Sequence, residues 1–260
     1  MQTVHMRTVN SGGRSLVRNF ALKGLASFLL MVLIFPLAAA AQAGTGLAHD
    51  LSGVWKPGPS DQTPAPPMTP AAQLRFDSNT RELKSGRPIT IDPAYSCHPP
   101  GVPRIYTYGV NPVEIVQTPQ RIFIFYESAH MWRQVWMDGR SMPTDSDPLW
   151  MGYSIGHWDG SDLVVESANF NDKTWLDGAG HPHSEALKVT ERIQRIDHDH
   201  LRISLLIEDP KFYTAGWKTQ RTYDLKPTWA VGEAFCIAED EAQWFEKNLP
   251  ESGGKPATGK

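Results

Sequence analysis

The sequence predicts an all-β fold in which an antiparallel meander of strands closes into a barrel, with one helix near the C-terminus. From Arg104 onward, short runs rich in aromatic and β-branched residues alternate with turn residues, which is typical of strands roughly five to ten residues long. Several junctions between these runs have the composition of hairpin turns. Apolar side chains recur at helical spacing at residues 239–249. Strands joined by tight turns curl into a barrel or, as the alternative, into a two-sheet β-sandwich.

The first 43 residues have the features of a signal peptide. Four basic residues and no acidic one precede an apolar run at residues 25–37, which ends in small residues. That run is about 13 residues long, whereas a membrane-spanning helix needs roughly 20. We therefore expect residues 1–43 to be removed and the protein to be periplasmic or secreted, with no stable membrane span afterwards.

Removal of this segment leaves an acidic chain. Four of the 25 Lys and Arg residues, and none of the 28 Asp and Glu residues, lie in the first 43 positions, so the formal charge changes from −3 to −7. Phosphate binding needs a clustered basic surface, so nucleic acid is not an expected partner. Residues 44–249 are expected to form one domain and residues 250–260 a disordered tail.

Residues 56–103 are rich in proline, glycine and polar residues, and we expect them to wrap over the barrel as irregular coil, with one helical turn at residues 71–76. Eight further strands are expected after this segment. They are expected at residues 113–118, 121–128, 131–137, 153–158, 162–168, 186–196, 200–209 and 217–225. Hairpin turns are expected at residues 119–120, 159–161 and 197–199.

The chain contains two cysteines, Cys97 and Cys236, and both lie in the exported part. In an oxidising compartment two thiols tend to pair, so we expect one disulfide that joins the wrapping segment to the C-terminal region. Two free buried thiols are the alternative.

Gly53-Val54-Trp55 resembles the Gly-x-Trp signature on the first strand of lipocalins and related calycin barrels. In those barrels the tryptophan closes one end, and an arginine from a late strand packs on it. The resemblance implies that Arg221 packs on Trp55, a contact worth roughly 0.5 to 2 kcal/mol. The proline-rich segment after Trp55 departs from the lipocalin pattern.

A closer resemblance covers most of the chain after the signal peptide. The segments NPVEIVQTP, GHWDGSDLVVES and FNDKTWLDGAGHPHS are similar to those of a widespread group of exported bacterial proteins. This resemblance implies family membership and export rather than a particular activity.

The aromatic side chains are numerous enough to line a pocket for a small aromatic or hydrophobic molecule. In the strand at residues 131–137, alternation places Arg133 on one face and Trp132 and Trp136 on the other. The candidate substrate-binding residues are Tyr126, Trp132, Trp136, Tyr153, Trp158 and Trp175. The alternative is that the tryptophans fill the core or cover the outer face of the sheet.

Acid/base chemistry without a cofactor is the favoured mechanism. It needs a proton acceptor, a carboxylate that orients this acceptor, and a cation for an anionic group of the substrate. Histidine can supply the base, and arginine can bind a carboxylate in bidentate fashion. The candidate catalytic residues are Arg133, His157, Asp177, His181, His183 and Glu191.

These residues favour an exported enzyme that acts on a small aromatic or hydrophobic molecule, as a lyase of decarboxylating or eliminating type, or as an isomerase or hydrolase. Phenolic acid decarboxylases resemble this scheme, because they are small lipocalin-like barrels that use Tyr, Arg and Glu without a cofactor. One alternative is a periplasmic lipocalin-like protein that only binds the small molecule. A second alternative is a metal-dependent hydrolase or oxygenase with His157, His181 and His183 as ligands.

Overall fold

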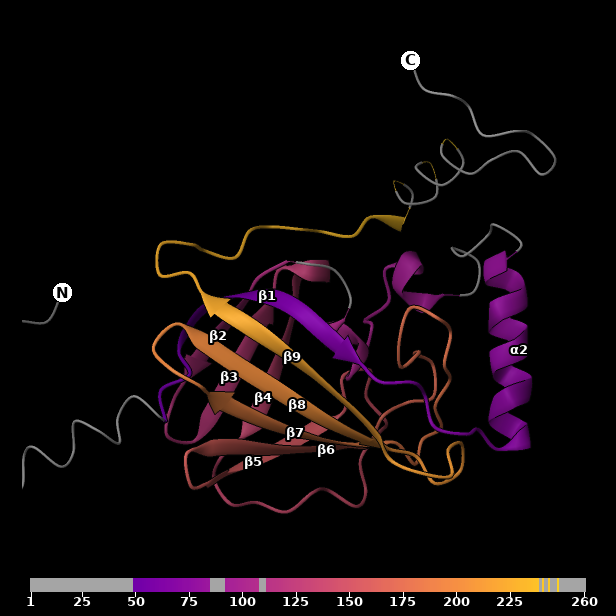
Figure 1. The fold of residues 1–260 in the computed structure, drawn as a ribbon, viewed down its shortest axis with the longest axis horizontal. Coiled ribbons are helices and arrows are strands. Elements are labelled where there is room, and N and C mark those ends of the chain that lie inside the picture. Colours follow the sequence, from indigo (N-terminus) through magenta and orange to yellow (C-terminus); the bar gives the residue numbers. More distant parts are fainter. Residues whose placement is uncertain are drawn as a thin grey trace, which may run out of the picture. The chain divides into compact units, whose positions relative to one another are not determined.

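The computed structural model describes residues 49–84, 92–107, 111–238, 240, 243 and 247. Within this part of the chain, nine strands form one closed barrel in sequence order (Figure 1). They are β1 (Gly53–Gln62), β2 (Val113–Gln117), β3 (Arg121–Tyr126), β4 (Met131–Trp136), β5 (Tyr153–Asp159), β6 (Asp162–Ala168), β7 (Lys188–Arg195), β8 (His200–Glu208) and β9 (Trp217–Leu225). The all-β barrel prediction is confirmed, and the two-sheet alternative is wrong because β9 pairs with β1.

The predicted signal peptide and the predicted C-terminal tail lie outside the described residues. Most of the predicted helix at residues 239–249 also lies outside them, but its described residues 240, 243 and 247 are helical. In the described part of the chain, no helix is long and apolar enough to cross a membrane.

Neighbouring strands are antiparallel everywhere in this barrel except between β4 and β5. These two strands pair in parallel, with Val135 opposite Ser154 and Trp136 opposite Ile155. The prediction of a wholly antiparallel meander is wrong at this point. Residues 137–152 carry the chain back along the barrel before β5 begins, and only such a crossover allows parallel pairing.

Alternating side chains fill the interior of the barrel. On β3, Ile122, Ile124 and Tyr126 are buried, whereas Arg121 and Phe125 are exposed, which is the period of two expected for a strand. Further interior positions are Val113, Ile115, Val135, Leu163, Val165, Val189, Ile193, Leu201, Ile203 and Leu205. The interior of this barrel is therefore a packed core.

Trp55 is fully buried on β1, and its indole N–H donates to the carbonyl oxygen of Leu51 at 2.9 Å. The arginine over its ring is Arg195 on β7, whose guanidinium carbon lies 5.3 Å from the ring centroid. The prediction that Arg221 packs on Trp55 is wrong, because Arg221 lies over Tyr223 instead. Which arginine reaches the indole depends on strand register, and register is not visible in a single sequence.

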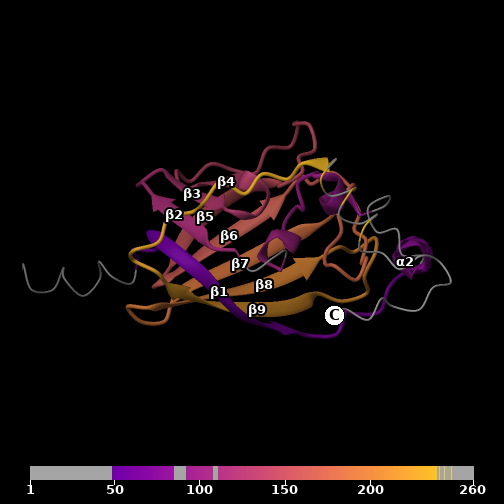
Figure 2. The same cartoon turned by 90° about the horizontal axis from the view of Figure 1, so that it is seen from above.

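The prediction of irregular coil at residues 56–103 is wrong in two places. Residues 56–62 belong to β1, and the helix α2 (Pro70–Lys84) is longer than the single predicted turn. Pro70 suits the first position of a helix, where its missing N–H leaves no hydrogen bond unmade. In both views α2 lies beside the loops at one end of the barrel (Figures 1 and 2). There Asn79 donates to the carbonyl oxygen of Gly180 at 2.9 Å, so the helix braces one of these loops.

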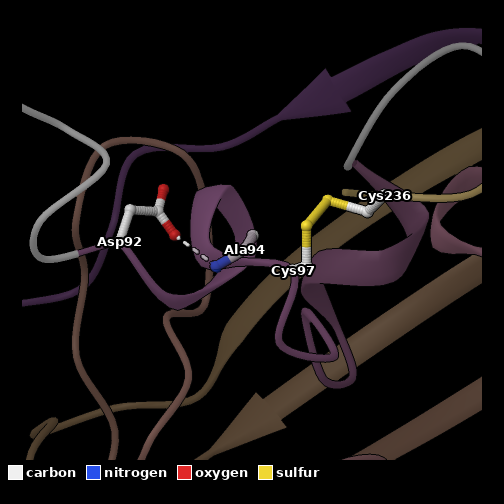
Figure 3. Close-up of a disulfide and its surroundings, with 4 residues drawn as sticks. All are labelled: Asp92, Ala94, Cys97 and Cys236. Carbon is white, nitrogen blue, oxygen red and sulfur yellow. Dashed lines mark hydrogen bonds between the residues drawn. A yellow bond between two sulfur atoms is a disulfide. The ribbon is translucent and has the colours of Figure 1, made fainter. Parts of the chain in front are cut away.

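Two 3₁₀ turns, η2 (Pro93–Ser96) and η3 (Arg104–Tyr106), precede β2. The predicted disulfide is confirmed: it joins Cys97, directly after η2, to Cys236, with Cα atoms 5.4 Å apart (Figure 3). The carboxylate of Asp92 caps η2 at the amide of Ala94 and also pairs with Arg104 of η3, where both charged side chains are buried. The disulfide connects this segment to the chain that follows β9, and the ion pair connects η2 to η3.

Candidate functional site

The loop at residues 175–183 brings an imidazole and a carboxylate together. The Nδ1 atom of His181 lies 2.7 Å from Oδ2 of Asp177, while Oδ1 of Asp177 accepts hydrogen bonds from the amides of Ala179 and His181. The amide of Leu176 donates to the carbonyl oxygen of His181 and closes the loop. Asp177 therefore shapes the turn and orients the histidine ring at the same time.

Aromatic rings from two other elements enclose this pair. The ring of Phe76 on α2 stacks on His181 with centroids 4.5 Å apart, and the ring of Trp217 on β9 meets His181 edge-on at 5.1 Å. The side chain of His181 is 15% exposed, so its ring can still be reached from solvent. Its Nε2 atom has no hydrogen-bond partner among the residues that the structure describes.

The electrostatics of the pair favour an ionised Asp177. Burial disfavours the carboxylate, but the hydrogen bond from His181 and its charge outweigh burial and lower the pKa of Asp177. A cavity of about 30 Å³ adjoins Asp177, lined among others by Pro103, Leu176 and Trp217. This volume holds about two water molecules.

His183 lies close in sequence but has different surroundings. It is 1% exposed, and its Nε2 atom lies 2.6 Å from the hydroxyl of Thr174 while Nδ1 lies 3.0 Å from the carbonyl oxygen of Ser184. Burial lowers the pKa of His183, which favours the neutral ring. With both ring nitrogens engaged, His183 holds the loop together and has no free atom for a substrate.

His157 is exposed on β5 and forms no cluster with His181 and His183 in the described part of the chain. The alternative ligand set of His157, His181 and His183 is therefore not gathered at one point. In the described ranges, no three His, Cys, Asp or Glu side chains form a group that could hold a metal ion.

Arg133 and Glu191 form a second polar pair, inside the barrel. Nη1 of Arg133 donates to Oε1 of Glu191 at 2.9 Å, and Nη2 donates to Oε2, so the contact is bidentate. Both side chains are almost completely buried. The predicted role of Arg133 as a clamp for a substrate carboxylate conflicts with this geometry, because Glu191 already occupies the fork of the guanidinium.

The six aromatic residues expected to bind substrate do not line one pocket. Trp132 is 56% exposed on the outer face of β4, and Trp136 on the same face is contacted by the guanidinium groups of Arg121 and Arg140. Tyr153 also faces Arg140, which donates to its hydroxyl. The packing of Trp132 and Trp136 thus agrees with the alternative that tryptophans cover the outer face of the sheet.

The remaining three occupy separate places. Trp158 stacks on His49, Trp175 is buried beneath the guanidinium of Arg104, and Tyr126 lies in the barrel interior. Phe76 and Trp217, which do contact His181, were not among the predicted site residues. Phe76 lies in the short predicted helical turn and Trp217 begins a predicted strand, but nothing in the sequence places either one near His181.

No protein-family model matches the chain, and no curated protein matches it in sequence. The geometry of the His181 loop is therefore the starting point for a functional assignment.

Proposed function

We propose that the protein is an exported enzyme that acts on a small aromatic or hydrophobic molecule by acid/base chemistry without an organic cofactor. The observation that carries this proposal is the partly exposed pair of His181 and Asp177 between two aromatic rings. The preferred reaction is a lyase reaction of decarboxylating or eliminating type. The disulfide and the signal-like N-terminus support a periplasmic or secreted location.

The pair has the features of a general base. Because Asp177 engages Nδ1, the neutral ring carries its proton there and leaves the lone pair of Nε2 free to accept a proton. An ionised carboxylate at Nδ1 also stabilises the imidazolium that forms after proton transfer. His181 is thus the base and Asp177 the residue that positions it.

The surroundings favour a flat apolar substrate. Phe76 and Trp217 offer aromatic surface on two sides of His181, and aromatic rings pack well against such surfaces. The cavity of about 30 Å³ beside Asp177 is too small for a ring, so the substrate approaches His181 from its solvent-exposed edge.

The decisive experiment is a turnover screen with matched histidine variants. The purified protein is incubated with a panel of small aromatic acids, esters and hydroxylated compounds, and products are detected by mass spectrometry. Loss of a general base costs about 100-fold or more in turnover, so His181→Asn should lose at least that factor, and Asp177→Asn should also be impaired.

His200→Asn is the matched control. His200 pairs with Asp197 through Nδ1 at 2.8 Å on an exposed hairpin, and no ring of the described residues stacks on it. It should keep full turnover. Retention of turnover by His181→Asn would rule out His181 as the base.

A binding protein is the second candidate, and one observation favours it. A groove of about 610 Å³ lies over β7, β8 and β9, where Thr190, Leu206 and Lys218 line it. Grooves of this size accommodate ligands in many proteins. A ligand that binds equally well to wild type and His181→Asn but is lost in Leu206→Glu, with no turnover in either protein, would favour this function.

A further inference from the structure

The barrel interior contains polar atoms whose hydrogen-bonding capacity is not used. The Nε atom of Arg133 and the hydroxyl of Tyr126 are buried and have no hydrogen-bond partner among the described residues. Buried polar groups are normally paired. An unpaired guanidinium nitrogen and an unpaired hydroxyl in the same part of the core therefore indicate a place where a polar ligand atom or a water can bind. A cavity of about 10 Å³ beside Tyr126 has room for no more than one water molecule.

The phenol ring next to these atoms does not come from a barrel strand. Tyr106 belongs to η3, yet its side chain is 3% exposed and reaches Arg133, whose Nη1 donates to the Tyr106 hydroxyl at 3.3 Å. Its ring meets that of Tyr126 edge-on, with centroids 6.1 Å apart. A segment outside the sheet thus supplies the phenol that fills this part of the core.

We propose that this part of the barrel interior is a binding site for the phenol group of a small molecule, and that Tyr106 occupies it as the chain's own stand-in ligand. Arg133 and Tyr126 recognise the hydroxyl group, while Glu191 keeps the guanidinium in place through its bidentate contact. This site goes beyond the proposed function and does not depend on His181. A phenol can enter only in place of Tyr106, because the free cavity is too small for a ring.

The segment that carries Tyr106 is held by a disulfide. Cys97 lies between η2 and η3, and its partner Cys236 lies in the strap of residues 226–238 that follows β9 (Figure 3). The strap also contacts the barrel through the amide of Gly232, which donates to Glu127, and through the ring of Phe235 against His130. Reduction of the disulfide removes the covalent connection between the strap and the Tyr106 segment, and should ease the exchange of Tyr106 for a ligand.

The test uses Tyr106→Ala and the ligand pair phenol and benzene. Removing the ring leaves space for either molecule, and a cavity of this kind binds benzene without any specific recognition. Recognition of the hydroxyl by a charged donor adds affinity, so phenol should bind about tenfold more tightly than benzene, as measured by calorimetry.

Phe170→Ala is the matched control. Phe170 is another buried ring at 1% exposure, but it lies against Gly152 and His183, away from Arg133 and Tyr126. Its cavity should show no comparable preference for phenol. The proposal is overturned if Tyr106→Ala is folded but binds neither ligand, or if phenol has no advantage over benzene there.

Should Tyr106→Ala fail to fold, the wild-type protein in dithiothreitol provides the deciding measurement. We expect saturable phenol binding in the reduced protein, at least tenfold tighter than in the oxidised protein, together with faster hydrogen exchange at the Tyr106 amide. Absence of phenol binding by the folded, reduced protein would then overturn the proposal.

Discussion

His183 illustrates how a histidine in a loop rich in polar residues can serve structure alone. Its ring is buried, Nδ1 donates to Ser184, and Nε2 accepts from the hydroxyl of Thr174 in the neutral form. A proton on Nε2 would reverse the hydrogen bond with Thr174, whose hydroxyl would then accept, and would place a charge in the core. Burial accordingly lowers the pKa of His183 below its ordinary value.

The pKa of His183 leads to a prediction for acid stability. Below about pH 6.5 the unfolded chain protonates this histidine while the folded chain does not, so the free energy of unfolding should fall as the pH is lowered through this range. The slope from one such group is at most about 1.4 kcal/mol per pH unit. Urea unfolding of wild type and His183→Gln between pH 7.5 and 5.5 measures this contribution.

The variant should be less stable at pH 7.5 but should lose less stability on acidification. His200→Gln, at an exposed hairpin, is the control and should follow the wild-type slope. If the free energy of unfolding changed equally with pH in wild type and His183→Gln, unfolding would not change the pKa of His183.

Residue pairs were predictable only where the partners are close in the chain. Asp177 and His181 lie four residues apart, so a shared loop already suggests their contact. Arg133 and Glu191 were both candidate residues, but their bidentate contact requires β4 and β7 to face each other across the barrel. A single sequence contains no information on which two strands face each other across a barrel.

At the scale of elements, the positions of β2 to β9 were predictable, whereas the extent of β1 and the β4–β5 pairing were not. The period of two, which is clear on β3 and β8, is the same whether the neighbouring strand runs parallel or antiparallel. The direction of β5 relative to β4 is set by the path of residues 137–152, which have no periodicity. The helix α2 was underestimated for a related reason: most of its described side chains are exposed, so no apolar stripe marks it.

Arg195 on β7 gives a prediction at this scale, because it connects three parts of the barrel rim. It lies over Trp55 of β1 and donates to the carbonyl oxygens of Asp50 and His198. Loss of the cation–π contact and of these hydrogen bonds should cost Arg195→Ala about 1–3 kcal/mol of unfolding free energy, measured by urea unfolding.

Arg192→Ala on the same strand is the control. Arg192 is 47% exposed and pairs with Asp159 and Asp162 at the surface, where ion pairs contribute about 0–1 kcal/mol. A similar loss of unfolding free energy in both variants would show that Arg195 contributes no more than a surface charge.

At the scale of the whole molecule, the number and spacing of the strands were enough to predict a closed barrel, but not what fills it. The sequence favoured an aromatic pocket, whereas the described interior is packed with aliphatic side chains, buried tyrosines and the ion pair of Arg133 and Glu191. Alternation shows which residues share a face of a strand, but the side chains that meet in the middle come from strands whose register the sequence does not specify.

The disulfide acts at this same scale, because the chain between Cys97 and Cys236 contains β2 to β9. The two cysteines are 139 residues apart, so their bond restricts a very large loop of the unfolded chain. Loss of a native disulfide in an exported domain typically costs about 2–5 kcal/mol. We expect this loss in the double variant Cys97→Ser, Cys236→Ser, as a lower urea midpoint at unchanged far-ultraviolet circular dichroism.

Wild type in dithiothreitol should unfold at the same midpoint as the double variant, since both lack the same covalent bond. The barrel closes through β1 and β9, which pair over six residue positions without help from the disulfide, so the reduced protein should remain folded at 25 °C in water. Equal midpoints for the oxidised wild type and the double variant would instead mean that the strap and η2 are held in place by their non-covalent contacts alone.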